Sequence, residues 1–121
     1  VDRTQVEQIK SVRQYLVEHL DRRITLQALS QTFSFPLTSM KKCFKEVYGT
    51  TINSYLQSYR IHTAAGLLRE TKRDVTEIAG KVGYQNASKF SEVFRQYTGH
   101  TPTEYRKTFC LIGADSVLRE W

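Results

Sequence analysis

A pattern typical of a short helix, a tight turn and a second helix occurs twice in the 121-residue chain. The clearer copy is VTEIAGKVGYQNASKFSEVFRQYTGHTP, residues 75–102, and a looser copy, TLQALSQTFSFPLTSMKKCFKEVYGTT, spans residues 25–51. Thr25 aligns with Asp74 and Phe44 with Phe94, so the shift between the copies grows from 49 to 50 positions within the turn. The second turn is therefore expected to be one residue longer, and each copy predicts a helix-turn-helix.

The two predicted corners differ at two positions. Ser30 and Ala79 stand where the two helices of a copy must approach each other closely. Gly83 suits a left-handed turn conformation because it has no Cβ, whereas the first copy has Ser34 at the matching position.

The whole chain shows helical periodicity, and no segment alternates as a strand would. We expect an all-α fold with seven helices: 4–20, a short helix after Thr25, 36–48, 52–70, 74–82, 86–98 and a last helix after Thr101. They form two helix-turn-helix subdomains, 1–50 and 72–108, which a long linker helix, 51–71, joins, and a C-terminal tail, 109–121, follows.

Capping and burial patterns add predictions for individual residues of these helices. Two helix starts predict capping boxes, Asp74 with Glu77 and Thr101 with Glu104. In the helix 86–98 the spacing predicts a buried edge formed by Phe90, Val93, Phe94 and Tyr97.

The chain is basic, with 18 Lys and Arg against 12 Asp and Glu, a net charge of +6. Such an excess favours a polyanionic partner, because phosphates bound by Lys and Arg release condensed counterions. No apolar run approaches the roughly 18 residues of a membrane span, and the polar start, VDRTQVEQIK, does not resemble a signal peptide. Val1 in place of Met hints at a piece of a longer protein.

Nothing in the sequence suggests catalysis, a metal site or a cofactor. The three histidines, His19, His62 and His100, are scattered and share no ligand spacing with either cysteine. Cys43 lies on a predicted buried edge, where a core thiol is expected, and Cys43 and Cys110 are too few for a disulfide framework. We therefore expect a non-enzymatic protein of the reducing cytoplasm.

Two helix-turn-helix copies in one basic chain indicate DNA binding. The second helix of such a motif enters the major groove, and successive major-groove faces lie about 34 Å apart. The linker helix of about 19 residues would span roughly 28 Å. We therefore expect one chain, acting as a monomer, to place two recognition helices in adjacent major grooves of an asymmetric site.

The segment YLQSYRIHTAAGLLRETKRDVTEIAGKVGYQNASKFSEVFRQYTGHTPTEYRK, residues 55–107, strongly resembles the C-terminal signature of the AraC/XylS family of bacterial transcription regulators. The resemblance rests on Arg60, Ala64 and the leucine pair 67–68, the IA..VGY corner, the F...F pair and G.TP.EYR. It implies a seven-helix domain that binds promoter double-stranded DNA and usually activates transcription. Ser30 and Ser34 depart from the Ala and Gly usual in the family.

On the first recognition helix, the residues matching the family's base contacts are Thr38, Lys41 and Lys42. Either lysine could donate to guanine O6 and N7, and the Thr38 methyl group could meet a thymine methyl group. The alternative is a solvated charged face. Lys45 is a candidate phosphate contact.

On the second recognition helix, the matching residues are Ala87, Ser88, Ser91 and Glu92. Glu92 could accept from cytosine N4, or it could be a surface residue that repels phosphate. Candidate phosphate contacts are Asn86, Lys89 and Arg95, although Arg95 could instead pair internally. With fewer long donors, this helix is expected to contribute more to backbone anchoring than to base discrimination.

The alternative function is a protein-interaction module that docks RNA polymerase or another regulator through its helix-turn-helix surfaces. Contact with RNA polymerase could also coexist with DNA binding. A longer parent protein could dimerise through a domain outside this chain.

Overall fold

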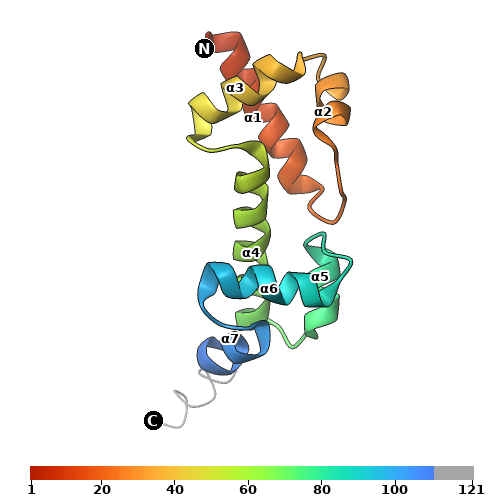
Figure 1. The fold of residues 1–121 in the computed structure, drawn as a ribbon, viewed down its shortest axis with the longest axis vertical. Helices are drawn as coiled ribbons and strands as arrows, with labels where there is room; N and C mark the ends of the chain where they lie inside the picture. Colours follow the sequence, from red (N-terminus) through yellow and green to blue (C-terminus); the bar gives the residue numbers. More distant parts are fainter. Residues whose placement is uncertain (111–121) are drawn as a thin grey trace. The chain divides into compact units, whose positions relative to one another are not determined.

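The computed structural model describes residues 1–110, which form seven α-helices and no strand, as predicted (Figure 1). The helices are α1 (Arg3–Glu18), α2 (Leu26–Thr32), α3 (Leu37–Tyr48), α4 (Ile52–Glu70), α5 (Val75–Lys81), α6 (Ala87–Thr98) and α7 (Pro102–Phe109). Of the predicted C-terminal tail, Phe109 closes α7 and Cys110 follows it, and residues 111–121 lie outside the described residues. Within residues 1–110 no helix is long and apolar enough to cross a membrane.

The chain divides into two compact units, Val1–Tyr59 and Arg60–Trp121. The boundary falls inside α4, so the first part of this helix belongs to one unit and the rest to the other. In the first unit, α1 packs on α3 through a core that includes Ile9, Val12, Leu16, Met40 and Phe44. In the second, the later part of α4 supplies Ile61, Ala64 and Leu68 to the core around Ile78, Phe90 and Phe94.

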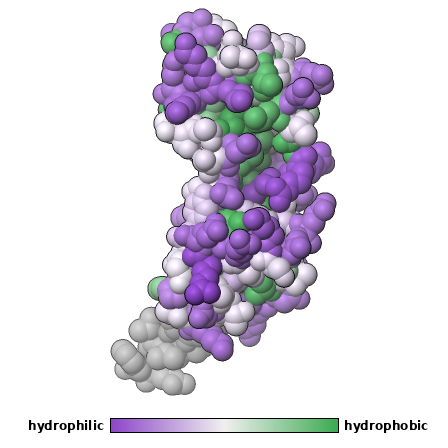
Figure 2. Space-filling view, viewed as in Figure 1, coloured by the Kyte–Doolittle hydropathy of each residue, from purple (hydrophilic) through white to green (hydrophobic). Residues whose placement is uncertain are grey.

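Hydrophilic side chains cover most of the face drawn in Figure 2. A hydrophobic patch is visible there over the α1–α3 unit, whose core is bordered by partly buried hydrophobic residues. The predicted buried edge of α6 holds for Phe90, Val93 and Phe94 but is wrong for Tyr97, which is 45% exposed. Tyr97 lies in the last turn of α6, at the end of the stripe.

Both corners are closed by the same backbone hydrogen bonds. The Phe35 N–H donates to the Ser30 carbonyl at 2.9 Å, and the Tyr84 N–H donates to the Ala79 carbonyl at 2.8 Å. As predicted, the second turn is one residue longer, because α2 ends at 32 and α3 begins at 37, whereas α5 ends at 81 and α6 begins at 87. The repeat in the sequence is therefore a repeat in the backbone.

The two unusual serines of the first corner have opposite effects on the stability of the fold. Ser34 has φ of +49°, the left-handed conformation that Gly83 adopts at the matching position with φ of +94°. This region costs an L-residue roughly 1–2 kcal/mol. The Ser30 hydroxyl, in contrast, donates across the turn to the Phe35 carbonyl at 2.5 Å, a bond that Ala79 cannot make.

The predicted caps are present, with one correction. The Asp74 side chain accepts from the Glu77 N–H at 2.7 Å. The Glu77 carboxylate does not accept from the Asp74 N–H to complete a capping box, and it pairs instead with Arg73 at 3.3 Å. The capping box of α7 is complete, since the Glu104 carboxylate accepts from the Thr101 N–H at 2.8 Å. That backbone hydrogen bond is the main reason why the pKa of Glu104 lies below its usual value.

We expect Ser34→Gly to raise the free energy of unfolding by about 0.5 kcal/mol. Relief of the left-handed strain exceeds the extra chain entropy that glycine brings to the unfolded state, about 0.4–1 kcal/mol. Urea unfolding followed by circular dichroism measures this change. The matched variant Ser30→Ala should lower stability by about 1 kcal/mol, since it removes the hydroxyl bond. Two changes of the same sign would contradict this account of the corner.

Candidate nucleic-acid interface

The helix α3 buries one edge and exposes the other. Met40, Cys43 and Phe44 face the core, because apolar residues spaced three and four apart lie on one side of a helix. The opposite stripe consists of the predicted residues Thr38, Lys41, Lys42 and Lys45, all of them exposed. None of the three lysines makes an ion pair with another residue among 1–110, so this stripe carries three ammonium groups available to a ligand.

The helix α6 presents the matching stripe with different chemistry. Shifting the stripe of α3 by 50 positions gives Ser88, Ser91, Glu92 and Arg95. Ser88, Glu92 and Arg95 are exposed, whereas Ser91 and the neighbouring Ala87 are half-buried. Thr38, Lys41, Lys42 and Lys45 thus share one face of α3, and Ser88, Ser91, Glu92 and Arg95 share the equivalent face of α6, with a lower positive charge. The other predicted residues of the second copy, Asn86, Ala87 and Lys89, lie at the start of α6 and beside this face.

The Glu92 carboxylate lies 3.9 Å from the ammonium group of Lys89, and both side chains are 60% exposed. Exposed pairs of this kind contribute little to stability, and either partner can leave at low cost. Each of these side chains can therefore exchange this partner for another.

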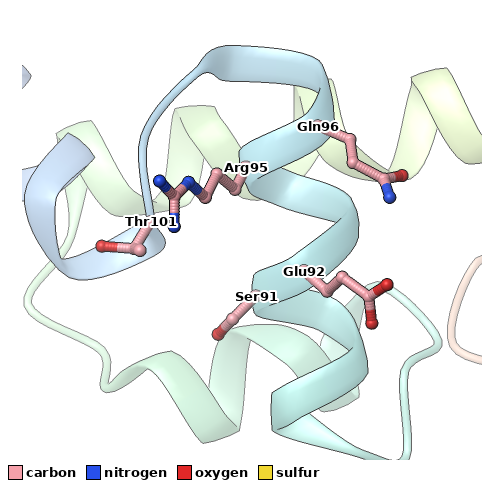
Figure 3. A pocket seen from close by; sticks show the side chains of 5 residues that line it. All are labelled: Ser91, Glu92, Arg95, Gln96 and Thr101. Carbon is pink, nitrogen blue, oxygen red and sulfur yellow. The ribbon is translucent and has the colours of Figure 1, made fainter.

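A shallow pocket lies along the outer face of α6 (Figure 3). Ser91, Glu92 and Arg95 line it together with Gln96 and Thr101. The Arg95 side chain extends toward Thr101 at the start of α7, and its positive charge contributes to the lowered pKa of Glu104. Gln96, which the sequence analysis did not single out, points outward one turn beyond Glu92 and could have been found by continuing the stripe.

The starts of the two helices differ in their open hydrogen-bond donors. The Asn86 side chain caps α6, accepting from the Ser88 N–H at 2.8 Å and from the Lys89 N–H at 3.1 Å. These backbone groups are therefore already paired. Pro36 occupies the N-cap position of α3 and provides no side-chain cap. The first turn of α3 therefore leaves more backbone N–H groups open to an anion than that of α6 does.

Three arginines make hydrogen bonds within their own units. Arg13 bonds to the hydroxyl of Tyr55, Arg69 bonds to the hydroxyl of Tyr105, and Arg106 bonds to backbone carbonyls. No local pattern in the sequence predicts these contacts. Part of the basic charge of the chain is thus engaged in holding helices together.

The arrangement is that of known DNA-binding domains. A family profile described as a helix-turn-helix domain matches residues 29–108. The HTH-type transcriptional activator RhaR of Mannheimia succiniciproducens is 33% identical over 104 residues, 86% of this chain and 38% of that protein. The regulatory protein SoxS of Salmonella typhimurium is 29% identical over 98 residues, 81% of this chain and 92% of that protein. The chain therefore spans less than half of one relative and most of the other.

Solved structures agree with these matches. The C-terminal domain of AraT, a response regulator from Geobacillus stearothermophilus, superposes with a TM-score of 0.80 at 28% identity, covering 84% of each chain. The DNA-binding domain of AdpA, solved in complex with a target DNA, superposes with a TM-score of 0.79. At 23% identity, covering 84% of this chain and 91% of that one, the AdpA match shows the fold alone.

We expect Asn86→Ala to lower the free energy of unfolding by about 1 kcal/mol, because α6 loses a side-chain cap that serves two N–H groups. Thermal unfolding provides the measurement. Asn86→Asp is the matched control, since a carboxylate oxygen accepts the same two bonds and should retain the stability. Equal losses in both variants would show that the cap is not what Asn86 contributes.

Proposed function

Since the chain belongs to the AraC/XylS family of helix-turn-helix transcription regulators, we propose that it binds promoter DNA with α3 and α6 in adjacent major grooves. The observation that carries this proposal is the pair of matching outer stripes, Thr38 to Lys45 and Ser88 to Arg95, on helices whose other edges are buried. The helix α4 runs unbroken over 19 residues between the two copies. A helix of that length spans about 28 Å, which suits grooves about one turn of DNA apart.

In this proposal the first unit performs most of the base discrimination. Lys41 and Lys42 reach guanine O6 and N7, and Thr38 contacts a thymine methyl group. The open first turn of α3 adds backbone N–H groups for a phosphate, and Lys45 provides a cation for the same strand.

The second unit combines weaker base reading with anchoring. Ser88, Ser91 and Glu92 face the base edges with Ala87 beside them, and Glu92 accepts from cytosine N4 once Lys89 has turned to a phosphate. Arg95 is a further phosphate contact, and Asn86 acts chiefly by capping α6 while its side-chain N–H groups remain available. Gln96 extends this face by one turn.

We propose that the chain binds DNA as a monomer in the bacterial cytoplasm and activates transcription. The name of the RhaR relative states transcriptional activation for that protein, and that of SoxS states a regulatory role. RNA polymerase is the expected protein partner. A longer parent protein would add dimerisation through another domain.

Selection of randomised duplex DNA with the 121-residue protein should recover one asymmetric site of about two helical turns. Binding to this site should weaken steeply between about 50 and 200 mM salt, because each phosphate contact releases counterions. Fluorescence anisotropy on the selected duplex measures the slope. Failure to enrich any sequence, together with salt-insensitive binding to a protein partner, would favour the interaction-module alternative.

Lys41→Ala should weaken binding to the selected duplex by about 1–3 kcal/mol and relax the preference at one base pair. Repeating the selection with the variant shows which position changes. The matched control is Lys10→Ala, which removes the same charge from an exposed position on α1. A uniform loss on all sequences would make Lys41 a phosphate contact.

A further inference from the structure

The helix α4 is shared by two units, and each unit is attached to its own part of the helix by an arginine. We propose that Arg106 is a positioning residue, which holds α7, and through it the recognition helix α6, in one orientation on the last turn of α4. This inference rests on the proposed two-groove function, because orientation matters only when both recognition helices bind one DNA.

Arg106 projects from α7 onto the end of α4. Its Nε donates to the Leu68 carbonyl at 3.2 Å, and its Nη2 donates to the carbonyls of Thr71 at 3.3 Å and Arg73 at 2.5 Å. Leu68 lies in the last turn of α4, where carbonyls lack partners within the helix and carry its negative dipole end. Thr71 and Arg73 lie in the segment between α4 and α5, so Arg106 bonds both to the end of α4 and to the carbonyls that follow it. A planar guanidinium with several donors satisfies them in one geometry, which a lysine ammonium group cannot do.

A second contact continues from α4 to the recognition helix. Arg69, in the last turn of α4, donates to the Tyr105 hydroxyl at 2.6 Å. The Tyr105 ring in turn packs edge-on against Phe94 at 5.2 Å between centroids, with an interplanar angle of 83°. Phe94 is fully buried on the inner edge of α6. The end of α4, α7 and α6 are thus linked by consecutive contacts.

The first unit has a matching chain of contacts. Arg13 donates to the Tyr55 hydroxyl at 2.8 Å, and the Tyr55 ring packs edge-on against Phe44 of α3 at 5.5 Å and 81°. Tyr55 and Tyr105 are repeat-related by 50 positions, but Arg13 and Arg69 are 56 apart and come from α1 and α4. The same contact is therefore formed from non-equivalent arginines, so it does not follow from the sequence repeat.

These contacts have a consequence for two-site binding. Once one recognition helix is bound, the effective concentration of the other depends on how well the connection presets its position. If the orientation of the second recognition helix is fixed, its binding costs less entropy, but the protein then fits only one spacing of the DNA half-sites. Loosening the attachment of α7 should weaken binding at the natural spacing and also make the protein more tolerant of other spacings.

The test uses the full chain and the duplex selected above, unaltered or with 1 or 2 base pairs inserted between its half-sites. Each inserted pair rotates one half-site by about a tenth of a turn. The wild-type protein should lose about tenfold in affinity on the altered duplexes, the equivalent of 1.4 kcal/mol. Arg106→Gln should bind the unaltered duplex about tenfold more weakly, and its further loss on insertion should shrink to about threefold or less.

Lys107→Gln is the matched control, because it removes the same charge from the neighbouring exposed position on α7 and should keep the wild-type spacing penalty. Circular dichroism verifies that each variant is folded. If Arg106→Gln does not fold, Tyr105→Phe provides the test, since it retains the ring against Phe94 and removes only the acceptor for Arg69.

An undiminished spacing penalty in the folded variant would overturn the positioning role and leave Arg106 as a stabilising residue only. A wild-type protein that binds the selected site but is indifferent to spacing would instead overturn the proposed two-groove function. The two failures are therefore distinguishable in one series of measurements.

Discussion

Burial of one aromatic edge on each recognition helix is the constraint on which the remaining features depend. Phe44 of α3 and Phe94 of α6 are completely buried, at positions related by the repeat. With 3.6 residues per turn, fixing this edge inside leaves the opposite stripe in solvent whatever residues occupy it. The fold therefore determines which face of each helix is available to a ligand. The residues on that face can differ between the copies without any change in the core. This separation explains how Lys42 and Glu92 can occupy equivalent positions on the same scaffold.

Several arginines serve the structure, whereas the basic residues on the outer stripe of α3 are lysines. Arg13, Arg69 and Arg106 form hydrogen bonds that join helices, and Arg60 is 7% exposed. The basic residues on the stripe of α3 are all lysines. A guanidinium presents a rigid fork of donors suited to fixed acceptors, whereas an ammonium group on a flexible stem can follow a phosphate or a base edge. The net charge of +6 thus includes structural arginines, so the charge of each outer stripe describes the proposed binding surface better than the net charge does.

Most of the fold could be predicted from the sequence because it depends on local signals. Helical periodicity, the caps at Asp74 and Thr101 and the extra residue in the second turn act over a few positions, and the structure confirms them. The exposure of Tyr97, the pairing of Glu77 with Arg73 and the contacts of Arg106 could not be predicted in this way. They depend on which side chains meet after folding. Arg13 and Tyr55, for example, are 42 residues apart. Periodicity placed the candidate site residues on the outer faces but gave no information on their partners, such as Lys89 for Glu92.

The asymmetry between the two copies follows from their being in one chain. The second copy has glycine at the left-handed turn position, a capped recognition helix and the Arg106 attachment. The first has a strained Ser34, an uncapped α3 and three exposed lysines. In a symmetric dimer both recognition helices carry identical residues, so each must combine local stability with base discrimination. Tandem copies can diverge independently, and here the local reinforcement lies mainly in one copy while the long donors lie mainly in the other. Under the proposed function an asymmetric DNA site is the natural counterpart of such a protein, because its two halves would meet different side chains.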